Sequence, residues 1–381
     1  MKLTRLYKEF FRSEKTGGLI LVFATALSLF LANSPYHSSY TAFWEIQFYH
    51  HSITHWINDG LMTIFFLLIG LELEREIYEG ELSSLKKSSL PIFAALGGML
   101  VPAIIFMTMN NGTPQAPGAG IPMATDIAFA IGILSLLGNR VPASLKIFLT
   151  ALAVIDDLGA IVVIAVFYTK TISVTNLVIA FSIYAGLIVM NRMKICKLTP
   201  YLIGGIAMWY FMLNSGVHAT ITGVLLAFAI PFGRSKEVSP SFHLQHLLHK
   251  PVAFFILPLF AIANTGIEIK TGWQGDVFQL GSLGIILGLF VGKPLGITLF
   301  SYLGVRFRMA ALPSDLKWTN IIGVGFLGGV GFTMSIFIAL LAFTQIEMSN
   351  SAKISILLGS FISAVVGFLF LSKNLKNKQI E

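Results

Sequence analysis

Apolar runs long enough to cross a lipid bilayer recur along the whole chain, and they constrain its fold more than any other feature. Inside a bilayer every backbone N–H and C=O group needs a partner within the protein, so a spanning segment is most simply a helix of about 20 apolar residues. The composition agrees, since 55% of the residues are hydrophobic and only 12% are charged. The sequence therefore predicts an all-α polytopic membrane protein that has the lipid bilayer as its surroundings.

About twelve such runs can be distinguished, and each predicts one transmembrane helix. The connections between them are short, so a single membrane transport domain over residues 1–381 accounts for the chain. The expected helices lie near residues 17–33, 57–78, 90–109, 122–138, 144–169, 174–191, 199–213, 217–231, 251–267, 280–303, 320–344 and 353–372.

The 26 Lys and Arg residues are distributed unevenly over the two sides of this topology. Only Lys170, Lys270 and Lys353 fall on one side, and apart from Lys293, which lies inside a run, all the others fall on the opposite side. The positive-inside rule assigns the basic side, and with it both termini, to the cytoplasm. Topology alone then explains the net charge of +8, so we expect no nucleic-acid partner. A single cysteine, Cys196, excludes an internal disulfide and a cysteine-based metal site.

Two of the expected helices contain residues that interrupt helical structure. Pro122 falls in AGIPMATDIAFAIG and lacks a backbone donor, while Gly328, Gly329 and Gly331 fall in GVGFLGGVGFTMS and weaken a helix strongly. If the glycines were the only signal, helix kinks or close helix packing through glycine would explain them. Interrupted segments in both halves of a transporter instead indicate a binding site near the middle of the membrane, built on inverted repeats.

Two adjacent carboxylates, Asp156 and Asp157, lie in the middle of the apolar run TALAVIDDLGAIVVIAVFY. A charged side chain at that depth costs about 2.5–3.5 kcal/mol on insertion scales, so the pair needs a partner, a proton or an ion. Neighbouring residues on a helix point about 100° apart, so the two side chains cannot face the same way. We expect one to meet a partner and the other to face an aqueous cavity.

Few other ionisable residues lie within the apolar runs. Lys293 needs a carboxylate partner, and one of the two aspartates is the expected one, although a purely structural ion pair would explain that contact as well. Asp126 follows the Pro122 break, where it either compensates exposed helix ends or binds an ion directly. Thr125 either adds a hydroxyl ligand or bonds back to its own helix. Asp59 is expected to start a helix at the outer interface rather than to carry transport chemistry.

Carboxylate chemistry indicates what such a site would bind. Hard cations such as Na⁺ and Li⁺ prefer oxygen ligands, and the same carboxylates also bind protons. A cation and protons then compete for Asp156 and Asp157, and alternating access turns this competition into an exchange cycle. We therefore expect Na⁺ or Li⁺ and H⁺ as transported ions, and no resident cofactor.

The chain closely resembles the NhaA-type Na⁺/H⁺ antiporters over nearly its full length. The resemblance rests on WINDGLMTIFFLLIGLELERE at 56–76, IPMATDIAFAIGIL at 121–134, LKIFLTALAVIDDLGAI at 145–161, SGVHATITGV at 215–224, VGKPLGI at 291–297 and GGVGFTMSIFIA at 328–339. It implies a twelve-helix, inverted-repeat fold whose fourth and eleventh helices are interrupted and cross near the site. It also implies a secondary active, electrogenic transporter in the inner membrane of a bacterium that exports sodium in exchange for protons, and not an enzyme.

The resemblance also assigns roles to single residues. Asp157 would be the principal cation ligand and proton carrier, and Asp156 would take part in binding and pair with Lys293. Asp126 and Lys293 would compensate the facing helix ends at the crossing.

Members of the family are regulated by pH at their cytoplasmic face, where this chain offers Glu72, Glu76, His246 and His249. Histidine titrates in the appropriate range. His243, His246 and His249, however, recur at a spacing of three in a polar loop or interfacial helix, for which a solvated face is the commoner explanation. Gln245 is neutral where the family pattern suggests a carboxylate, and the 34–56 connection is short for the homodimer contact that this loop makes in the family.

Two other classes of protein need consideration. An intramembrane aspartyl protease uses two membrane aspartates on separate helices, which Asp156 and Asp157 cannot provide without Asp126. A passive cation channel would also place carboxylates in the membrane. An assay for gradient-driven exchange without a peptide substrate separates all three.

Overall fold

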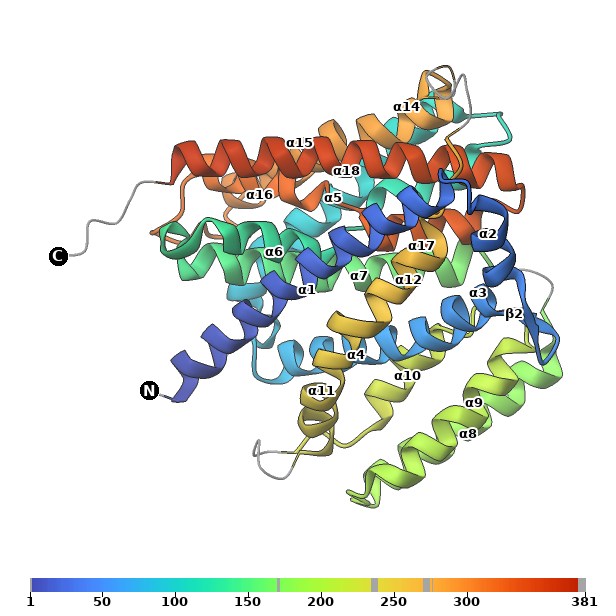
Figure 1. Ribbon diagram of the computed structural model, residues 1–381. Coiled ribbons are helices and arrows are strands. Elements are labelled where there is room, and N and C mark those ends of the chain that lie inside the picture. The colour runs from blue at the N-terminus through green and yellow to red at the C-terminus, as the bar shows by residue number, and fades with distance from the viewer. Residues whose placement is uncertain (1, 170–171, 234–238, 270–274, 276, 376–381) are drawn as a thin grey trace.

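The computed structural model describes residues 2–169, 172–233, 239–269, 275 and 277–375, and these residues form a bundle of helices (Figure 1). Lys170 and Lys270, two of the three basic residues expected on the less basic side, lie outside the described residues. The start of α1 and the end of α18 lie at the same end of the bundle, and the small β-hairpin lies at the opposite end (Figure 1).

The first half of the chain contains the following elements: α1 (Lys2–Ala32), α2 (His37–Glu45), β1 (Gln47–Phe48), β2 (His51–Ser52), α3 (Ile53–His55), the π-helix η1 (Trp56–Leu61), α4 (Met62–Tyr78), the 3₁₀ helix η2 (Glu81–Ser83), α5 (Leu85–Asn110), the 3₁₀ helix η3 (Ala116–Met123), α6 (Ile127–Leu136), the 3₁₀ helix η4 (Gly138–Arg140), α7 (Ala143–Phe167) and α8 (Val174–Arg192).

The second half contains α9 (Leu198–Leu213), α10 (Ile221–Ala229), α11 (Pro240–Pro251), the π-helix η5 (Val252–Ile256), α12 (Leu257–Asn264), α14 (Leu280–Leu287), the π-helix η6 (Gly288–Gly292), α15 (Lys293–Arg306), α16 (Trp318–Gly328), α17 (Phe332–Ala342) and α18 (Ile346–Asn374).

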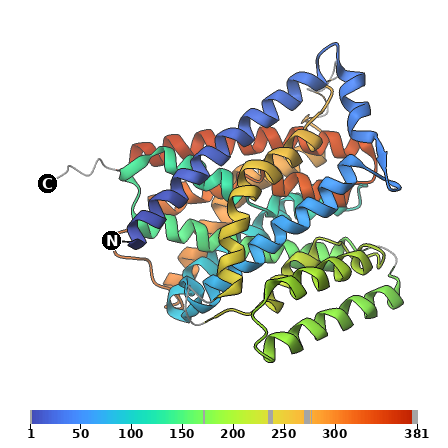
Figure 2. The ribbon, with the colours of Figure 1, turned by 60° about the horizontal axis from the view of Figure 1, so that its bottom comes forward.

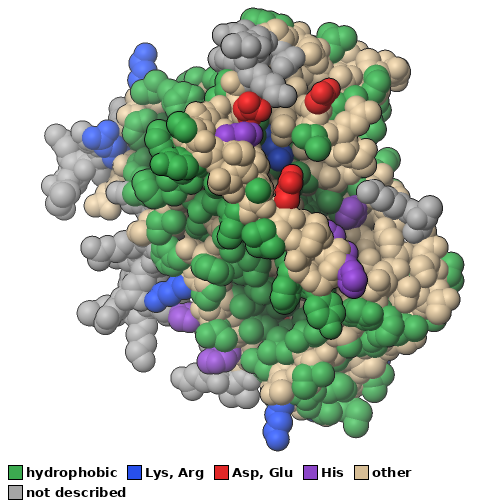
Figure 3. All heavy atoms as spheres, turned by 45° about the vertical axis from the view of Figure 1, so that its right-hand side comes forward, with side chains coloured by type: hydrophobic (Ala, Val, Ile, Leu, Met, Phe, Trp, Pro, Cys, Tyr) green, Lys and Arg blue, Asp and Glu red, His purple; other side chains and the backbone are tan. Residues whose placement is uncertain are grey.

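The prediction of an all-α polytopic membrane protein is confirmed. Among the described residues, eight helical segments are long and apolar enough to cross a membrane, or up to ten if each of two bent pairs counts as one span. The shorter apolar helix α9 and the nine-residue α10 occupy the remaining two expected runs. Many large apolar side chains point outward, as they do over much of the face in Figure 3, which is the arrangement expected of a surface in contact with lipid.

The connection at residues 34–56 is more ordered than a polar loop. It contains α2 and a two-stranded antiparallel hairpin in which Gln47 pairs with Ser52 and Phe48 with His51. Tyr49 and His50 form the turn with φ of 52° and 68°, which matches the right-handed twist of a short hairpin. The fold is thus helical apart from this small hairpin among the described residues.

Several helices begin earlier than expected, among them α1 at Lys2 rather than residue 17 and α18 at Ile346 rather than residue 353. Two further starts have identifiable reasons. The helical segment expected from residue 57 begins at Ile53, because the Ser52 hydroxyl caps it by accepting from the His55 N–H at 3.2 Å. The interpretation of Asp59 as a helix-start residue is therefore wrong, and Asp59 lies within η1 and contacts His55 at 3.2 Å. The segment expected from residue 251 begins at Pro240, where Ser239 accepts from the Phe242 N–H at 3.3 Å.

Both expected interruptions are present. The first lies over residues 124–126, between η3 and α6, and Pro122 is inside η3 rather than at the break itself. The second lies between α16 and α17, which meet at an angle of 47° around residues 329–331. The two breaks touch each other, because the Asp126 N–H donates to the Val330 carbonyl at 2.7 Å.

The helices are packed unevenly around these breaks. Helix α5 packs along α15, α16 and α17 pack against α18, and α4 packs against α10 and α11. Helices α8 and α9 run side by side at one edge of the bundle (Figure 2). Helix α7, which carries Asp156 and Asp157, packs against α4, α5 and α6 in the interior of the bundle.

Candidate ion-binding site

Helix α7 carries Asp156 and Asp157 at its middle, and both side chains are buried, with 1% of their surface exposed. The helix is regular on both sides of the pair, because it contains no proline between Ala143 and Phe167 and its apolar side chains are packed within the bundle. Adjacent positions on this helix point in different directions. The two carboxylates consequently meet different surroundings.

Asp156 faces α15 and meets Lys293. The Lys293 ammonium is fully buried, and its Nζ lies 2.5 Å from Asp156 Oδ2 and 2.8 Å from Thr125 Oγ1. Lys293 starts α15 directly after the π-helix η6, and such short π-helical turns are frequent at functional sites. The structure thus brings together the lysine and one of the two aspartates that the sequence offered as partners.

Thr125 connects this pair to the second interrupted helix. Its hydroxyl donates to the Gly328 carbonyl at 2.8 Å and accepts from Lys293. Gly328 is the last residue of α16, so the bond satisfies a carbonyl that the break leaves without a helical partner. The Thr125 side chain bonds to the other interrupted helix. The alternative that it bonds back to its own helix is therefore not what the structure shows.

Asp126 lies between the N-terminal ends of two helices. Its Oδ1 accepts from the Phe129 N–H of α6 at 2.9 Å, and its Oδ2 accepts from the N–H and the hydroxyl of Thr333 in α17, at 3.2 and 2.5 Å. Both helix ends carry a partial positive charge of about half a unit. A carboxylate here satisfies freed amide donors of both breaks and offsets the facing helix dipoles.

Gly329 allows the second break to pack tightly. A Cβ atom at this position would lie 2.2 Å from the Leu289 carbonyl oxygen, which belongs to η6. Backbone cannot retreat as a flexible side chain can, so only glycine fits here. The Ser335 hydroxyl donates to the Ile121 carbonyl at 2.7 Å and so adds a further bond between the two interrupted helices.

The carboxylate pair retains unused acceptors. Asp156 Oδ1 and Asp157 Oδ1 are buried and have no hydrogen-bond partner within the described part of the chain. Asp157 lies within electrostatic range of Asp156, Asp126 and Lys293. Such orphaned buried oxygens need an explanation, and a bound ion or proton provides one.

The described residues contain no group of three or more His, Cys, Asp or Glu side chains that could hold a metal ion. Two carboxylates alone give fewer oxygens than a dehydrated hard cation prefers. A cation at Asp156 and Asp157 would therefore complete its coordination with hydroxyl, carbonyl or water oxygens.

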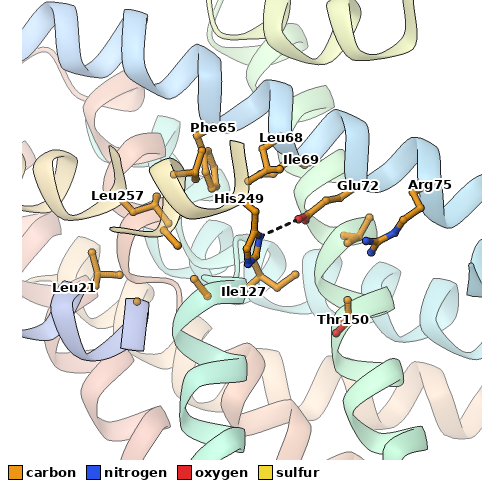
Figure 4. A pocket seen from close by; sticks show the side chains of 15 residues that line it. Leu21, Phe65, Leu68, Ile69, Glu72, Arg75, Ile127, Thr150, His249 and Leu257 are labelled. Atoms are coloured by element: carbon orange, nitrogen blue, oxygen red, sulfur yellow. Dashed lines mark ion pairs between the residues drawn. The ribbon is translucent and has the colours of Figure 1, made fainter. Parts of the chain in front are cut away.

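A cavity of about 60 Å³ opens beside α7, between α1, α4, α6 and the α11–α12 segment, and it has room for several water molecules (Figure 4). Its wall includes Thr150 and Val154 of α7, which lie on the same helix face as Asp157. Asp157 itself is buried beyond the lining residues. The expected contact of one aspartate with an aqueous cavity is therefore not made in this conformation.

The candidate pH-sensing residues separate into two groups. Glu72 and His249 point toward each other across the cavity, with Oε1 and Nδ1 3.9 Å apart and Arg75 beside them (Figure 4). Glu76 pairs with Arg75 at 3.1 Å and accepts from the Glu81 N–H, away from the cavity lining. His246 lies exposed on α11.

Sequence reasoning missed several residues that hold this region together. Gln245 was noted only as a neutral residue, and the structure buries its side chain within interaction range of the Glu72 carboxylate. Glu74 is buried and accepts from the Ser241 hydroxyl at 2.7 Å. Thr333 and Ser360 supply polar partners to the breaks. Single serines and threonines in apolar runs are common. Only Thr333 carried a signal in the sequence, because it lies beside the glycine break.

Comparison with known proteins adds an independent observation. Residues 8–371 match the family described as Na⁺/H⁺ antiporter 1. The chain is 65% identical over 371 residues to the Na⁺/H⁺ antiporter NhaA 1 of Flavobacterium johnsoniae, which covers 97% of both chains. It is 62% identical to the Na⁺/H⁺ antiporter NhaA of Flavobacterium psychrophilum, over 100% of this chain and 99% of that one.

The similarity extends to more distant organisms. The Na⁺/H⁺ antiporter NhaA of Vibrio campbellii is 48% identical over 378 residues, which is 98% of this chain and 97% of the relative. The matches span nearly the whole chain, so they include both interrupted helices, the aspartate pair and Lys293.

Proposed function

Since the chain belongs to the NhaA family of Na⁺/H⁺ antiporters, we propose that it exports Na⁺ or Li⁺ in exchange for protons, with the cation and the protons competing for Asp156 and Asp157. One observation carries the assignment to these residues. Two adjacent carboxylates deep in the bundle each have a buried oxygen without a hydrogen-bond partner among the described residues, although the polar groups around them are paired.

The chemistry follows from the difference between the two aspartates. Asp156 already has an ammonium partner, so in the ionised state its negative charge is largely compensated by Lys293. Asp157 has no such partner in the described structure, so it needs a proton or a cation whenever it is buried. A cation that binds at Asp157 displaces a proton, and a proton that returns releases the cation.

Alternating access turns this competition into transport. The cavity beside α7 offers ions a route along Thr150 and Val154 toward Asp157 from one side. Movement of the interrupted helices would then expose the carboxylates to the other side. If two protons leave for each monovalent cation that binds, the exchange carries net charge and responds to membrane potential.

Two further features complete the proposal. Both termini lie in the cytoplasm of a bacterial cell, because most Lys and Arg residues fall on the side of the termini. With this orientation, the cavity opens toward the cytoplasm. The pH response centres on the contact of Glu72 with His249 at the cavity, whereas Glu76 and His246 lie outside the cavity lining. The hairpin at residues 47–52, where Phe48 and Tyr49 are exposed, forms the contact of a homodimer.

The structural detail disfavours the protease alternative. Both oxygens of Asp126 accept hydrogen bonds from helix ends, so Asp126 is not available as the second member of a catalytic dyad with Asp156 or Asp157. A passive channel would not couple the two ions. The function assignment itself therefore depends on a coupled-transport measurement.

The deciding experiment uses purified protein in proteoliposomes that enclose a pH-sensitive dye. Addition of Na⁺ or Li⁺ should dissipate an imposed proton gradient, and K⁺ at the same concentration should not. A membrane potential should change the rate in the presence of Na⁺. Uncoupled flow of Na⁺ without proton movement would identify a channel and contradict the proposal.

A further inference from the structure

The first three residues at the α17 end of the second break have their backbone N–H groups fully accounted for. The N–H groups of Gly331 and Phe332 both donate to the Ser360 hydroxyl oxygen, at 3.2 and 3.1 Å. The next N–H, of Thr333, donates to Asp126 Oδ2 at 3.2 Å. Asp126 and Ser360 thus divide the amide donors of one helix end between them.

Ser360 comes from α18, a helix that contributes no charged residue to the site. It is 5% exposed, and α18 packs along both α16 and α17. Inside a membrane protein an N–H group at a helix break needs a partner within the protein. Ser360 supplies that partner from outside the two interrupted helices.

The amides held by Ser360 are continuous with the ion site. Phe332 precedes Thr333, which binds Asp126, and Asp126 follows Thr125, which accepts from Lys293. Lys293 in turn contacts Asp156. A shift at the start of α17 is therefore transmitted to the ammonium and the carboxylate through a short series of polar contacts.

We propose that Ser360 is a positioning residue for the ion site, which holds the α17 end of the break so that Asp126 and Thr125 keep Lys293 aligned on Asp156. This inference rests on the proposed function. Without the Ser360 oxygen, the N–H groups of Gly331 and Phe332 must find other acceptors, and Asp126 already accepts from the next residue, Thr333. Asp126 can accept them only by giving up the bonds it makes to Phe129 or Thr333.

The chain provides a matched control on the same helix. Ser355 is fully buried and donates to the Ser351 carbonyl of α18 itself at 2.8 Å. Ser363 is fully buried, one turn beyond Ser360, and its hydroxyl has no hydrogen-bond partner in the part of the chain that the structure describes. Neither hydroxyl accepts from the break, but Ser363 Oγ lies against Gly329, so Ser355→Ala is the control for removing a buried serine.

The first measurement is the Na⁺ dependence of exchange in proteoliposomes at one fixed pH. Ser360→Ala removes both hydrogen bonds that the hydroxyl accepts and should raise the KM for Na⁺ by about tenfold, with Vmax changed less than KM. Ser360→Thr keeps the hydroxyl and should retain the wild-type KM. The same KM in Ser360→Ala as in the wild type, or equal increases in Ser360→Ala and Ser355→Ala, would overturn the proposal.

The second measurement does not depend on transport. Hydrogen–deuterium exchange of peptides that cover residues 329–334 should be faster in Ser360→Ala than in the wild type, and unchanged in Ser355→Ala. Unchanged exchange in Ser360→Ala would show that Ser360 does not hold these amides. If the wild type failed to exchange Na⁺ for H⁺, the proposed function would fail, while these rates would still report whether Ser360 positions α17.

Discussion

Lys293 Nζ lies 2.5 Å from Asp156 Oδ2, whereas Asp157, the next residue on the same helix, makes no ion pair in the part of the chain that the structure describes. This difference gives the two aspartates different tasks. The Lys293 ammonium compensates the charge of Asp156. The charge of Asp157 needs a transported cation or a proton. The predictions below follow from that asymmetry and from the contacts around it.

Removal of the Lys293 ammonium should destabilise the protein. Lys293→Ala leaves Asp156 buried without its partner, which typically costs about 3–5 kcal/mol, so the detergent-solubilised protein should melt at a lower temperature. Asp156→Asn in the same background should restore part of the loss. Thermal shifts of the two single variants that simply add would contradict the pairing, because contacting partners show coupling of at least about 0.5 kcal/mol.

Asp126→Asn should also lower stability. An asparagine presents one oxygen and one N–H₂ group, so it cannot accept from Phe129 and Thr333 at the same time. One buried donor is left without a partner, at a cost of about 1–3 kcal/mol. The melting temperature of the variant checks this expectation, and Asp315→Asn serves as the control, because Asp315 is exposed and an amide oxygen can still accept from the Ser144 hydroxyl. A wild-type melting temperature for Asp126→Asn would argue against its role at the helix ends.

Gly329→Ala should disturb the second break severely. The added Cβ would meet the Leu289 carbonyl oxygen at 2.2 Å, so η6 and the break must separate. Because η6 leads directly into Lys293, we expect a loss of both folded yield and Na⁺ exchange. Gly186→Ala in α8 is the matched control, since nothing lies within 4 Å of a Cβ there and alanine favours a helix over glycine. Normal yield and exchange in Gly329→Ala would show that the close approach is not required.

Acidic cytoplasmic pH should reduce exchange, and the cause can be separated into two parts. Protons that compete with Na⁺ at Asp157 and Asp156 produce a loss that high Na⁺ reverses. A separate sensor produces a loss that saturating Na⁺ does not reverse. We expect mainly competition with a modest contribution from the Glu72–His249 contact at the cavity.

The pH profile of His249→Ala at saturating Na⁺ measures that contribution. It should shift modestly, whereas His246→Ala should leave the profile unchanged, because His246 is exposed outside the cavity lining. If both profiles coincide with the wild type, the histidine contribution is absent. If His246→Ala shifts the profile as much as His249→Ala, the cavity contact is not its origin.

Much of this arrangement could be predicted from sequence because bilayer physics leaves few options. Apolar runs must be helices, and charges such as Asp156 and Lys293 must pair when they are buried. The breaks were also predictable, since Pro122 and Gly329 weaken helices strongly. The helix starts at Ile53 and Pro240 were missed because serine caps and polar first turns carry no hydropathy signal.

The identity of each partner could not be derived from sequence. Thr125 was open between an ion ligand and a bond to its own helix, and only the packing of two distant segments shows that it bonds to Gly328. Ser360 lies more than two dozen residues beyond the amides it accepts from, and an isolated serine in an apolar helix does not stand out. Pairing of this kind depends on tertiary structure, which local sequence patterns do not encode.

The most direct test of the central claim is Na⁺-driven proton release from proteoliposomes containing Asp157→Asn, compared with Asp156→Asn and the wild type at equal protein content. The asparagine keeps the shape of the side chain and cannot cycle a proton. Asp157→Asn should abolish exchange at every Na⁺ concentration while the protein stays folded, and Asp156→Asn should lower exchange severely but can leave a residual rate. Wild-type exchange in Asp157→Asn would contradict the assignment of Asp157 as the carrier of both the cation and the proton.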